Sequence, residues 1–166
     1  MKNIYSKAIL LLLPVMLTGC DFINKATLHT VSFEEYREKA LKVDTGHPYT
    51  QVVVTGYTAS IDDVNELYTY DAENNTWVAS EDNKTTSNAN KYIVDVKSDA
   101  KSIDKTMKEL VDEVVFKVGL SGSFEYSYTD KSAEFKLQFV DKYGMITYYY
   151  YKVGSTVRHF EFKYSK

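Results

Sequence analysis

The sequence predicts an α+β domain in which a curved antiparallel β-sheet packs against an N-terminal helix and one mid-chain helix. Residues 124–164 alternate apolar and polar side chains in four runs joined by short turns, and strands joined in this way are antiparallel. Two segments, 33–43 and 100–116, have helical periodicity, and the chain between them contains segments rich in Tyr, Thr and Val. The length of 166 residues suits one domain with its own core.

The first residues have the three parts of a secretion signal, namely a basic start with Lys2 and Lys7, an apolar run over 8–17, and small residues before Cys20. A helix that crosses the hydrocarbon core of a membrane needs about 20 apolar residues, so this run is too short for a permanent membrane span. We therefore expect residues 1–19 to be a signal peptide that is removed.

The end of this segment, Leu17-Thr18-Gly19-Cys20, resembles the bacterial lipobox. In lipobox proteins a signal peptidase cuts before the cysteine, whose thiol carries a diacylglycerol, and two acyl chains on one residue form a stable anchor. The resemblance implies lipidation of Cys20, attachment to a bacterial cell membrane, and a domain that faces the aqueous phase outside the cytoplasm. An ordinary buried cysteine is the alternative. Asp21 is either an inner-membrane retention signal or a solvated linker residue, depending on the host.

We expect a tether over 20–32 and a single domain over 33–166. Ser32 followed by Glu35 has the spacing of a capping box, which predicts a helix over 33–43. One apolar stripe of this helix comprises Phe33, Tyr36, Ala40 and Val43.

The next part of the chain has the composition of strands. Segments 49–58, 64–71 and 76–79 are rich in Tyr, Thr and Val and are predicted to be strands. The polar stretch 80–90 is predicted to be a surface loop. Residues 92–96 form a candidate short strand.

The second helix is predicted to end near residue 116, with Ser98 or Asp99 as its candidate N-cap. Apolar residues recur with helical spacing from 103 to 118. The tail 114–118 is rich in β-branched residues and also suits a strand.

The last 45 residues predict a meander of four strands. Alternation marks segments 124–128, 133–139, 145–153 and 157–164. Gly144 provides the residue best suited to a positive φ in the turn between the second and third strands.

Charge and composition exclude several classes of function. Because Lys2 and Lys7 lie in the leader, the remaining chain carries 18 Lys and Arg against 23 Asp and Glu, which does not favour nucleic-acid binding. The single cysteine excludes an intrachain disulfide, and the histidines at 29, 47 and 159 do not have zinc-site spacing.

No catalytic motif is present, so we expect neither an enzyme nor a cofactor. The acidic pairs Asp62-Asp63 and Asp71/Glu73 are typical of a solvated surface. The stretch 71–75 lacks the glycine and the terminal glutamate of a calcium-binding EF-hand loop.

The high aromatic content, with 15 Tyr and 8 Phe in the chain, is the remaining indication of function. The run Tyr148-Tyr149-Tyr150-Tyr151 places two tyrosines on each face of one strand. Such residues stabilise sheets through cross-strand pairs, which is one interpretation. The other is that a curved sheet lined with aromatic side chains holds an acyl chain or another hydrophobic ligand.

The order of lipobox, tether, helix, meander interrupted by a helix, and a final hairpin over 139–146 resembles the lipoprotein-carrier (LolA-like) group of half-barrel proteins. The resemblance implies a half-barrel sheet whose concave face binds acyl chains and contains no catalytic residue. The candidate ligand-facing or core residues are Phe124, Tyr126, Phe135, Leu137, Phe139, Tyr149, Tyr151, Phe160 and Phe162.

Two hypotheses follow. The first is a membrane-anchored, non-enzymatic lipoprotein that binds a hydrophobic or amphipathic ligand on the concave aromatic face of its sheet. The alternative is a structural or interaction lipoprotein of the cell envelope that binds a protein or glycan partner through exposed tyrosines and the loop 80–90.

Overall fold

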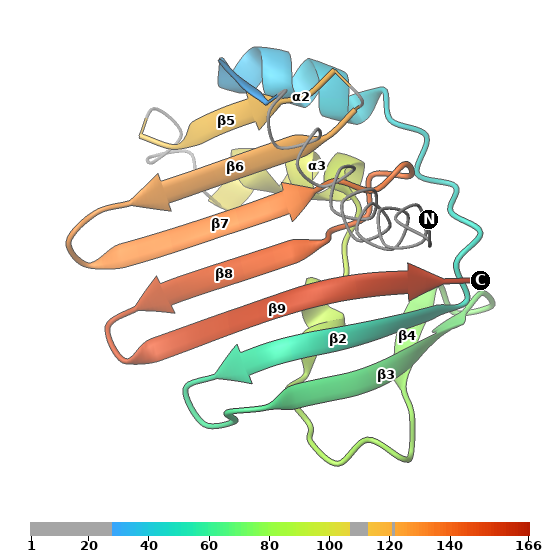
Figure 1. The fold of residues 1–166 in the computed structure, drawn as a ribbon. Helices are drawn as coiled ribbons and strands as arrows, with labels where there is room; N and C mark the ends of the chain where they lie inside the picture. Colours follow the sequence, from blue (N-terminus) through green and yellow to red (C-terminus); the bar gives the residue numbers. More distant parts are fainter. Residues whose placement is uncertain (1–27, 107–112, 121) are drawn as a thin grey trace, which may run out of the picture.

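The computed structural model describes residues 28–106, 113–120 and 122–166. The predicted signal peptide and Cys20 lie outside these residues. Within them, nine strands form a single sheet accompanied by two α-helices and a 3₁₀ helix (Figure 1). The strands are β1 (His29–Val31), β2 (Gln51–Thr58), β3 (Val64–Asp71), β4 (Thr76–Ala79), β5 (Val115–Val118), β6 (Phe124–Thr129), β7 (Ala133–Phe139), β8 (Tyr148–Val153) and β9 (Thr156–Ser165). The helices are α2 (Phe33–Leu41), η1 (Ala89–Tyr92) and α3 (Val96–Thr106).

The sheet confirms the predicted fold class. Its strand order is β1-β5-β6-β7-β8-β9-β2-β3-β4, and each neighbouring pair is antiparallel. Strands β5 to β9 form a continuous meander, β2 joins β3 and β4 to β9, and β1 pairs with β5 at the other edge of the sheet. The result is an open, curled sheet of half-barrel type, and in the view of Figure 1 α3 lies behind β6 and β7 while α2 lies along the β5 end of the sheet.

Helix α2 begins where the capping pattern predicts. The Ser32 hydroxyl accepts a hydrogen bond from the Glu35 backbone N–H at 3.2 Å, which satisfies one of the free donors at the start of the helix. The helix ends at Leu41, two residues before the predicted end. Tyr36 and Ala40 are fully buried and anchor the helix to the sheet.

Helix α3 starts earlier than predicted, at Val96. Its first turn is capped by Asp95, whose carboxylate accepts hydrogen bonds from the Ser98 N–H at 2.8 Å and the Ser98 hydroxyl at 2.7 Å. Neither Ser98 nor Asp99 is therefore the cap. Asp95 is favoured because its side chain accepts from the N–H groups that the first turn leaves free.

The predicted helix end near residue 116 is wrong, because residues 115–118 form β5. This strand pairs with β1 on one side and β6 on the other, so its backbone groups are hydrogen-bonded along both edges. Its β-branched residues favour this extended conformation. Strand β1 was not predicted, and it lies in the segment expected to be tether.

Two further boundaries differ from the predictions. Residues 89–92 form the 3₁₀ helix η1, and only Asp95 in the predicted strand 92–96 makes a bridge, with Met145. Strand β8 begins at Tyr148 because Met145 and the residue after it pair instead with the segment leading into α3. Gly144 has φ +69°, as its predicted turn requires.

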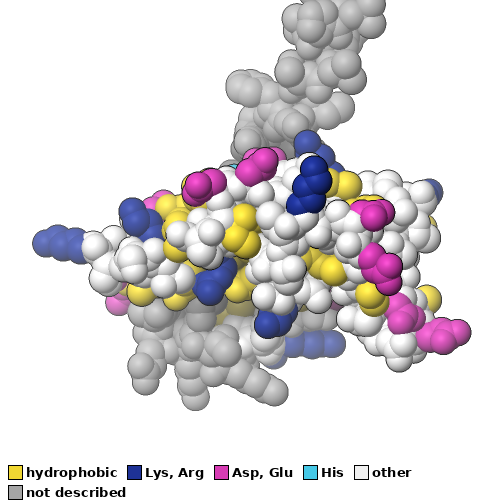
Figure 2. All heavy atoms as spheres, turned by 90° about the horizontal axis from the view of Figure 1, so that it is seen from below, with side chains coloured by type: hydrophobic (Ala, Val, Ile, Leu, Met, Phe, Trp, Pro, Cys, Tyr) yellow, Lys and Arg dark blue, Asp and Glu magenta, His cyan; other side chains and the backbone are white. Residues whose placement is uncertain are grey.

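The hydrophobic core lies between the sheet and the two helices. Tyr36 of α2 packs against Phe116 and Tyr126, with ring centroids 5.0 and 6.0 Å apart. Seen from the side of β3, hydrophobic side chains are interspersed with charged side chains of both signs (Figure 2).

Candidate ligand cavity

A cavity of about 540 Å³ lies between α3 and the middle of the meander. Strands β6, β7 and β8 contribute one wall, while α3 and η1 contribute the other. A volume of this size is in the range of small-molecule sites. The lining residues are Tyr92, Asp99, Ser102, Ile103, Tyr126, Phe135, Leu137, Tyr149 and Tyr151.

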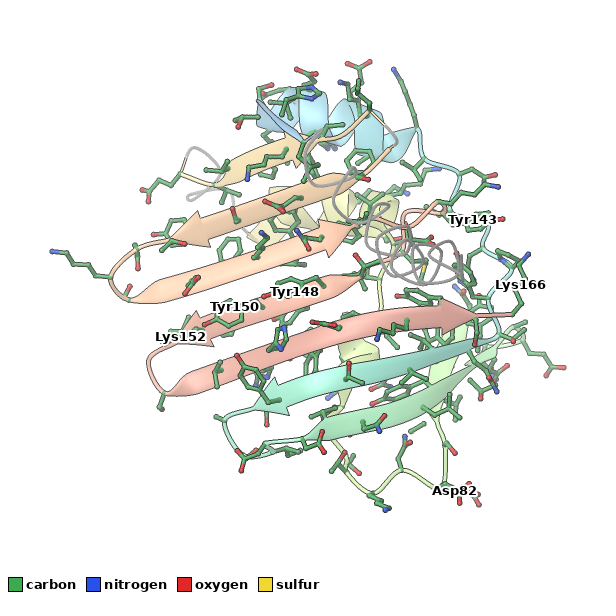
Figure 3. All side chains as sticks on the ribbon, in the orientation of Figure 1. Asp82, Tyr143, Tyr148, Tyr150, Lys152 and Lys166 are labelled. Carbon is green, nitrogen blue, oxygen red and sulfur yellow. The ribbon has the colours of Figure 1, made fainter. Side chains whose placement is uncertain are left out.

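Strand alternation decides which tyrosines reach the cavity. Tyr149 and Tyr151 line it from β8, whereas Tyr148 and Tyr150 lie on the opposite face of the same strand (Figure 3). The Tyr149 ring packs against Tyr92 of η1, with centroids 4.5 Å apart. The predicted division of this tyrosine run between two faces is therefore present in the sheet.

The nine predicted aromatic and apolar positions fall into two groups. Tyr126, Phe135, Leu137, Tyr149 and Tyr151 line the cavity. The others are buried core residues, and these are Phe124, Phe139, Phe160 and Phe162. The core group supports the lining from below, since Phe160 packs on both Tyr92 and Tyr149.

Asp99 is the one carboxylate among the lining residues in the described part of the chain. Its Oδ1 accepts a hydrogen bond from the Tyr126 hydroxyl at 3.1 Å. Its Oδ2 is buried and has no hydrogen-bond partner within the described part of the chain. Burial, together with the negative charge of Asp95, raises the pKa of Asp99 to about 7, against the opposing effect of the Tyr126 hydrogen bond.

Tyr36 adds a second buried polar atom close to this carboxylate. Its hydroxyl has no hydrogen-bond partner among the described residues. Burial and the nearby charge of Asp99 raise the pKa of Tyr36 well above its ordinary value. The same two causes act on Tyr126, so both phenols stay neutral at physiological pH.

Sequence reasoning missed four lining residues: Tyr92, Asp99, Ser102 and Ile103. The spacing of residues along the predicted second helix could have indicated Asp99 as a lining residue. Val96, Ala100 and Ile103 form the buried stripe of α3, and Asp99 falls on the same side of the helix. An acidic residue on an apolar helix face is unusual enough to mark a candidate site.

A second cleft, of about 370 Å³, lies between the β6–β7 and β8–β9 turns. Its lining consists of turn residues and charged side chains without an aromatic ring, over 130–134 and 152–154. Because the apolar surface and the buried polar group are both in the larger cavity, we take that cavity as the candidate site.

The opposite face of the sheet carries a separate aromatic cluster around His159. The rings of Tyr57, Tyr148 and Tyr150 lie 5.0, 5.1 and 6.4 Å from the His159 ring. Tyr57 is 39% exposed. This cluster corresponds to the exposed tyrosine face of the alternative hypothesis.

The polar loop 80–90 is fastened to the sheet by Glu66, which is almost fully buried. Its carboxylate accepts hydrogen bonds from the Thr85 hydroxyl at 2.9 Å, the Ser87 N–H and hydroxyl at 2.7 Å each, and the Tyr68 hydroxyl. Burial alone would raise the pKa of Glu66, but these hydrogen bonds outweigh it and lower the pKa. These hydrogen bonds therefore hold the loop against strand β3.

Among the described residues, no three His, Cys, Asp or Glu side chains are grouped so that they could hold a metal ion. No described helix is both long and apolar enough to cross a membrane. No family model, no curated protein and no solved structure matches this chain.

Proposed function

We propose that this protein is a membrane-anchored extracytoplasmic lipoprotein that holds a hydrophobic or amphipathic ligand in the cavity between α3 and strands β6–β8. The observation that carries the proposal is the 540 Å³ cavity itself, whose walls are mainly aromatic and aliphatic. Such a lining removes an apolar ligand from water, at a gain of about 25 cal/mol for each Å² of apolar surface buried. The proposed role is binding, without a catalytic step.

The test of ligand binding uses two matched double variants of β8. The first, Tyr149→Ala with Tyr151→Ala, removes two rings from the cavity wall. The second, Tyr148→Ala with Tyr150→Ala, removes the same number of rings from the opposite face of the same strand (Figure 3). Each protein is purified from bacterial cells and its mass measured under native conditions, with and without added lipid.

We expect the wild-type protein and the Tyr148/Tyr150 variant to retain a bound mass in the lipid range. The Tyr149/Tyr151 variant should lose it because its binding wall is gone. A wild-type protein that stays free of ligand when lipid is added would contradict the proposal. Equal lipid uptake by the two variants would contradict the cavity as its location.

Membrane anchoring rests on the lipobox pattern that ends at Cys20. The test is metabolic labelling with an alkyne-bearing fatty acid in a bacterial host, followed by separation of membranes from soluble protein. We expect the wild-type chain to carry label in the membrane fraction and the Cys20→Ala variant to carry none. Label that persists in the variant would contradict lipidation at this residue.

The aromatic cluster around His159 supports a second candidate function, the binding of a protein or glycan partner on the opposite face of the sheet. Tyrosine rings are common anchors at interfaces because they offer a large apolar surface with a polar tip. Under this alternative, the Tyr148/Tyr150 variant is the one that loses its partner in a crosslinking experiment in cells, and the Tyr149/Tyr151 variant keeps it.

A further inference from the structure

The polar group in the cavity points to the chemistry of the ligand's head. Of the lining residues that the structure describes, Asp99 is the one with an ionisable carboxyl, and no lysine, arginine or histidine is among them. Arg158 is opposite Tyr151 in the β8–β9 ladder and its positive charge acts on Tyr149, but its side chain lines a different cleft together with Ser60 and Ser87. Among the described lining residues Asp99 is therefore the one source of charge, and this charge is negative when the carboxyl is ionised.

This carboxylate is incompletely satisfied. Tyr126 donates to Oδ1, while Oδ2 is buried without a partner among the described residues. A buried charged oxygen without a donor is costly, and the cost is offset when a bound group supplies the donor. A cationic donor offsets it most, since hydrogen bonds between two charged groups are the strongest.

The rings around Asp99 suit the same kind of head group. Tyr126 bonds directly to the carboxylate, and Tyr149 is close enough to Tyr126 that their charges would interact. Tyr92 packs on Tyr149 and completes the aromatic wall. The faces of aromatic rings attract cations, by about 0.5 to 2 kcal/mol or more when water is excluded.

We propose that the ligand is an amphiphile with a protonated amine head, which donates to Asp99 while its aliphatic chain lies against Phe135 and Leu137. This proposal deepens the proposed function and rests on it. An acceptor-type head, such as a carboxylate, would require Asp99 to be protonated and would gain nothing from the aromatic faces.

The proposal predicts a definite pH dependence. Tyr126 on β6, Tyr149 on β8 and Tyr36 on α2 all have pKa values raised above the ordinary 10, so they remain neutral from about pH 6 to about pH 8.5. Asp95, at the N-cap of α3, adds negative charge. An alkylammonium head keeps its proton up to about pH 10. Over this range Asp99 is thus the facing group that titrates, and amine binding should strengthen as pH rises.

The experiment compares three probes with the same twelve-carbon chain, namely dodecylamine, 1-dodecanol and dodecanoate, each below its micelle-forming concentration. Binding to the purified protein is measured by isothermal titration calorimetry at about pH 6 and about pH 8.5. The variants are Asp99→Asn, which removes the cavity charge while keeping the shape, and Asp62→Asn, which removes the same charge from the exposed β2–β3 turn.

We expect dodecylamine to bind at least roughly tenfold more tightly than 1-dodecanol at the higher pH, and by a smaller factor at the lower pH. Asp99→Asn should remove the pH dependence of this difference and most of its size, since only the attraction of the ring faces for the cation remains, and Asp62→Asn should preserve both. The comparison of the three probes on the wild-type protein tests the proposal even where a variant fails to fold.

Equal affinity for all three probes, or a preference for dodecanoate, would overturn the amine inference and leave the proposed ligand binding in place. No binding of any probe to the wild-type protein would overturn the proposed function, and the amine inference with it.

Discussion

Replacing Asp99 by asparagine should make the protein more stable, and the gain should be larger in mildly alkaline solution than in mild acid. In the unfolded chain Asp99 ionises at its ordinary pKa of 3.8, whereas in the folded protein burial raises the pKa to about 7. Between these two values the folded state binds more protons than the unfolded state. The free energy of unfolding therefore falls as pH rises through this window, and the loss is complete above about pH 7.

The size of the effect follows from the shift. A displacement of about three pKa units corresponds to at most about 4 kcal/mol, because each unit is worth about 1.4 kcal/mol. The side chain is only partly shielded from water, and the asparagine amide has a burial cost of its own. We therefore expect Asp99→Asn to raise the free energy of unfolding above the pKa by about 2 kcal/mol. Asparagine does not ionise in either state, so the gain over the wild-type protein grows as pH rises from 3.8 to about 7 and is constant above that.

The assay is urea unfolding of the wild-type protein and Asp99→Asn at about pH 5 and about pH 8.5, followed by tyrosine and tryptophan fluorescence. Subtracting the two proteins at each pH removes the contributions of the other titrating groups, provided that they do not couple to Asp99. A difference in unfolding free energy that is the same at both pH values would refute a raised pKa at Asp99. Asp62→Asn serves as the control, for which no such pH dependence is expected.

Two further predictions concern the sheet. Gly56 has φ +150°, and a Cβ at this position would lie 1.9 Å from the His159 carbonyl oxygen. Gly56→Ala should therefore lower the free energy of unfolding by about 2 kcal/mol or more. An unchanged urea midpoint would show that the backbone here is free to relax. Glu66→Gln should weaken the bonds that hold the loop 80–90 and speed its cleavage by trypsin, while cleavage at the wild-type rate would mean that the carboxylate does not restrain the loop.

Local patterns in the sequence were sufficient for most of the fold. Ser32 and Glu35 mark the start of α2 because a capping pair acts over three residues and needs no distant partner. The segments 64–71 and 76–79 match β3 and β4 residue for residue, since strand composition and the intervening turn are also local. Alternation along β8 likewise fixes which tyrosines share a face.

Predictions failed where a distant segment decides the outcome. Residues 115–118 continue a helical period, yet they form a strand because β1 and β6 are available to pair with both of their edges. Met145 leaves the expected strand because the chain leading into α3 pairs with it. In both places the competing partner is remote in the sequence, so no local pattern could reveal it.

The sequence by itself determined the fold class, the order of most elements, and which aromatic residues share a face of the sheet, because these follow from periodicity, capping and turn chemistry. Only the tertiary structure decided that Tyr126, Phe135, Leu137, Tyr149 and Tyr151 line a cavity while their four companions fill the core. It also brought Asp99 of α3 beneath the Tyr126 hydroxyl of β6, 27 residues away. Packing geometry sets both outcomes, since the space between a helix and a curved sheet depends on every contact that positions them.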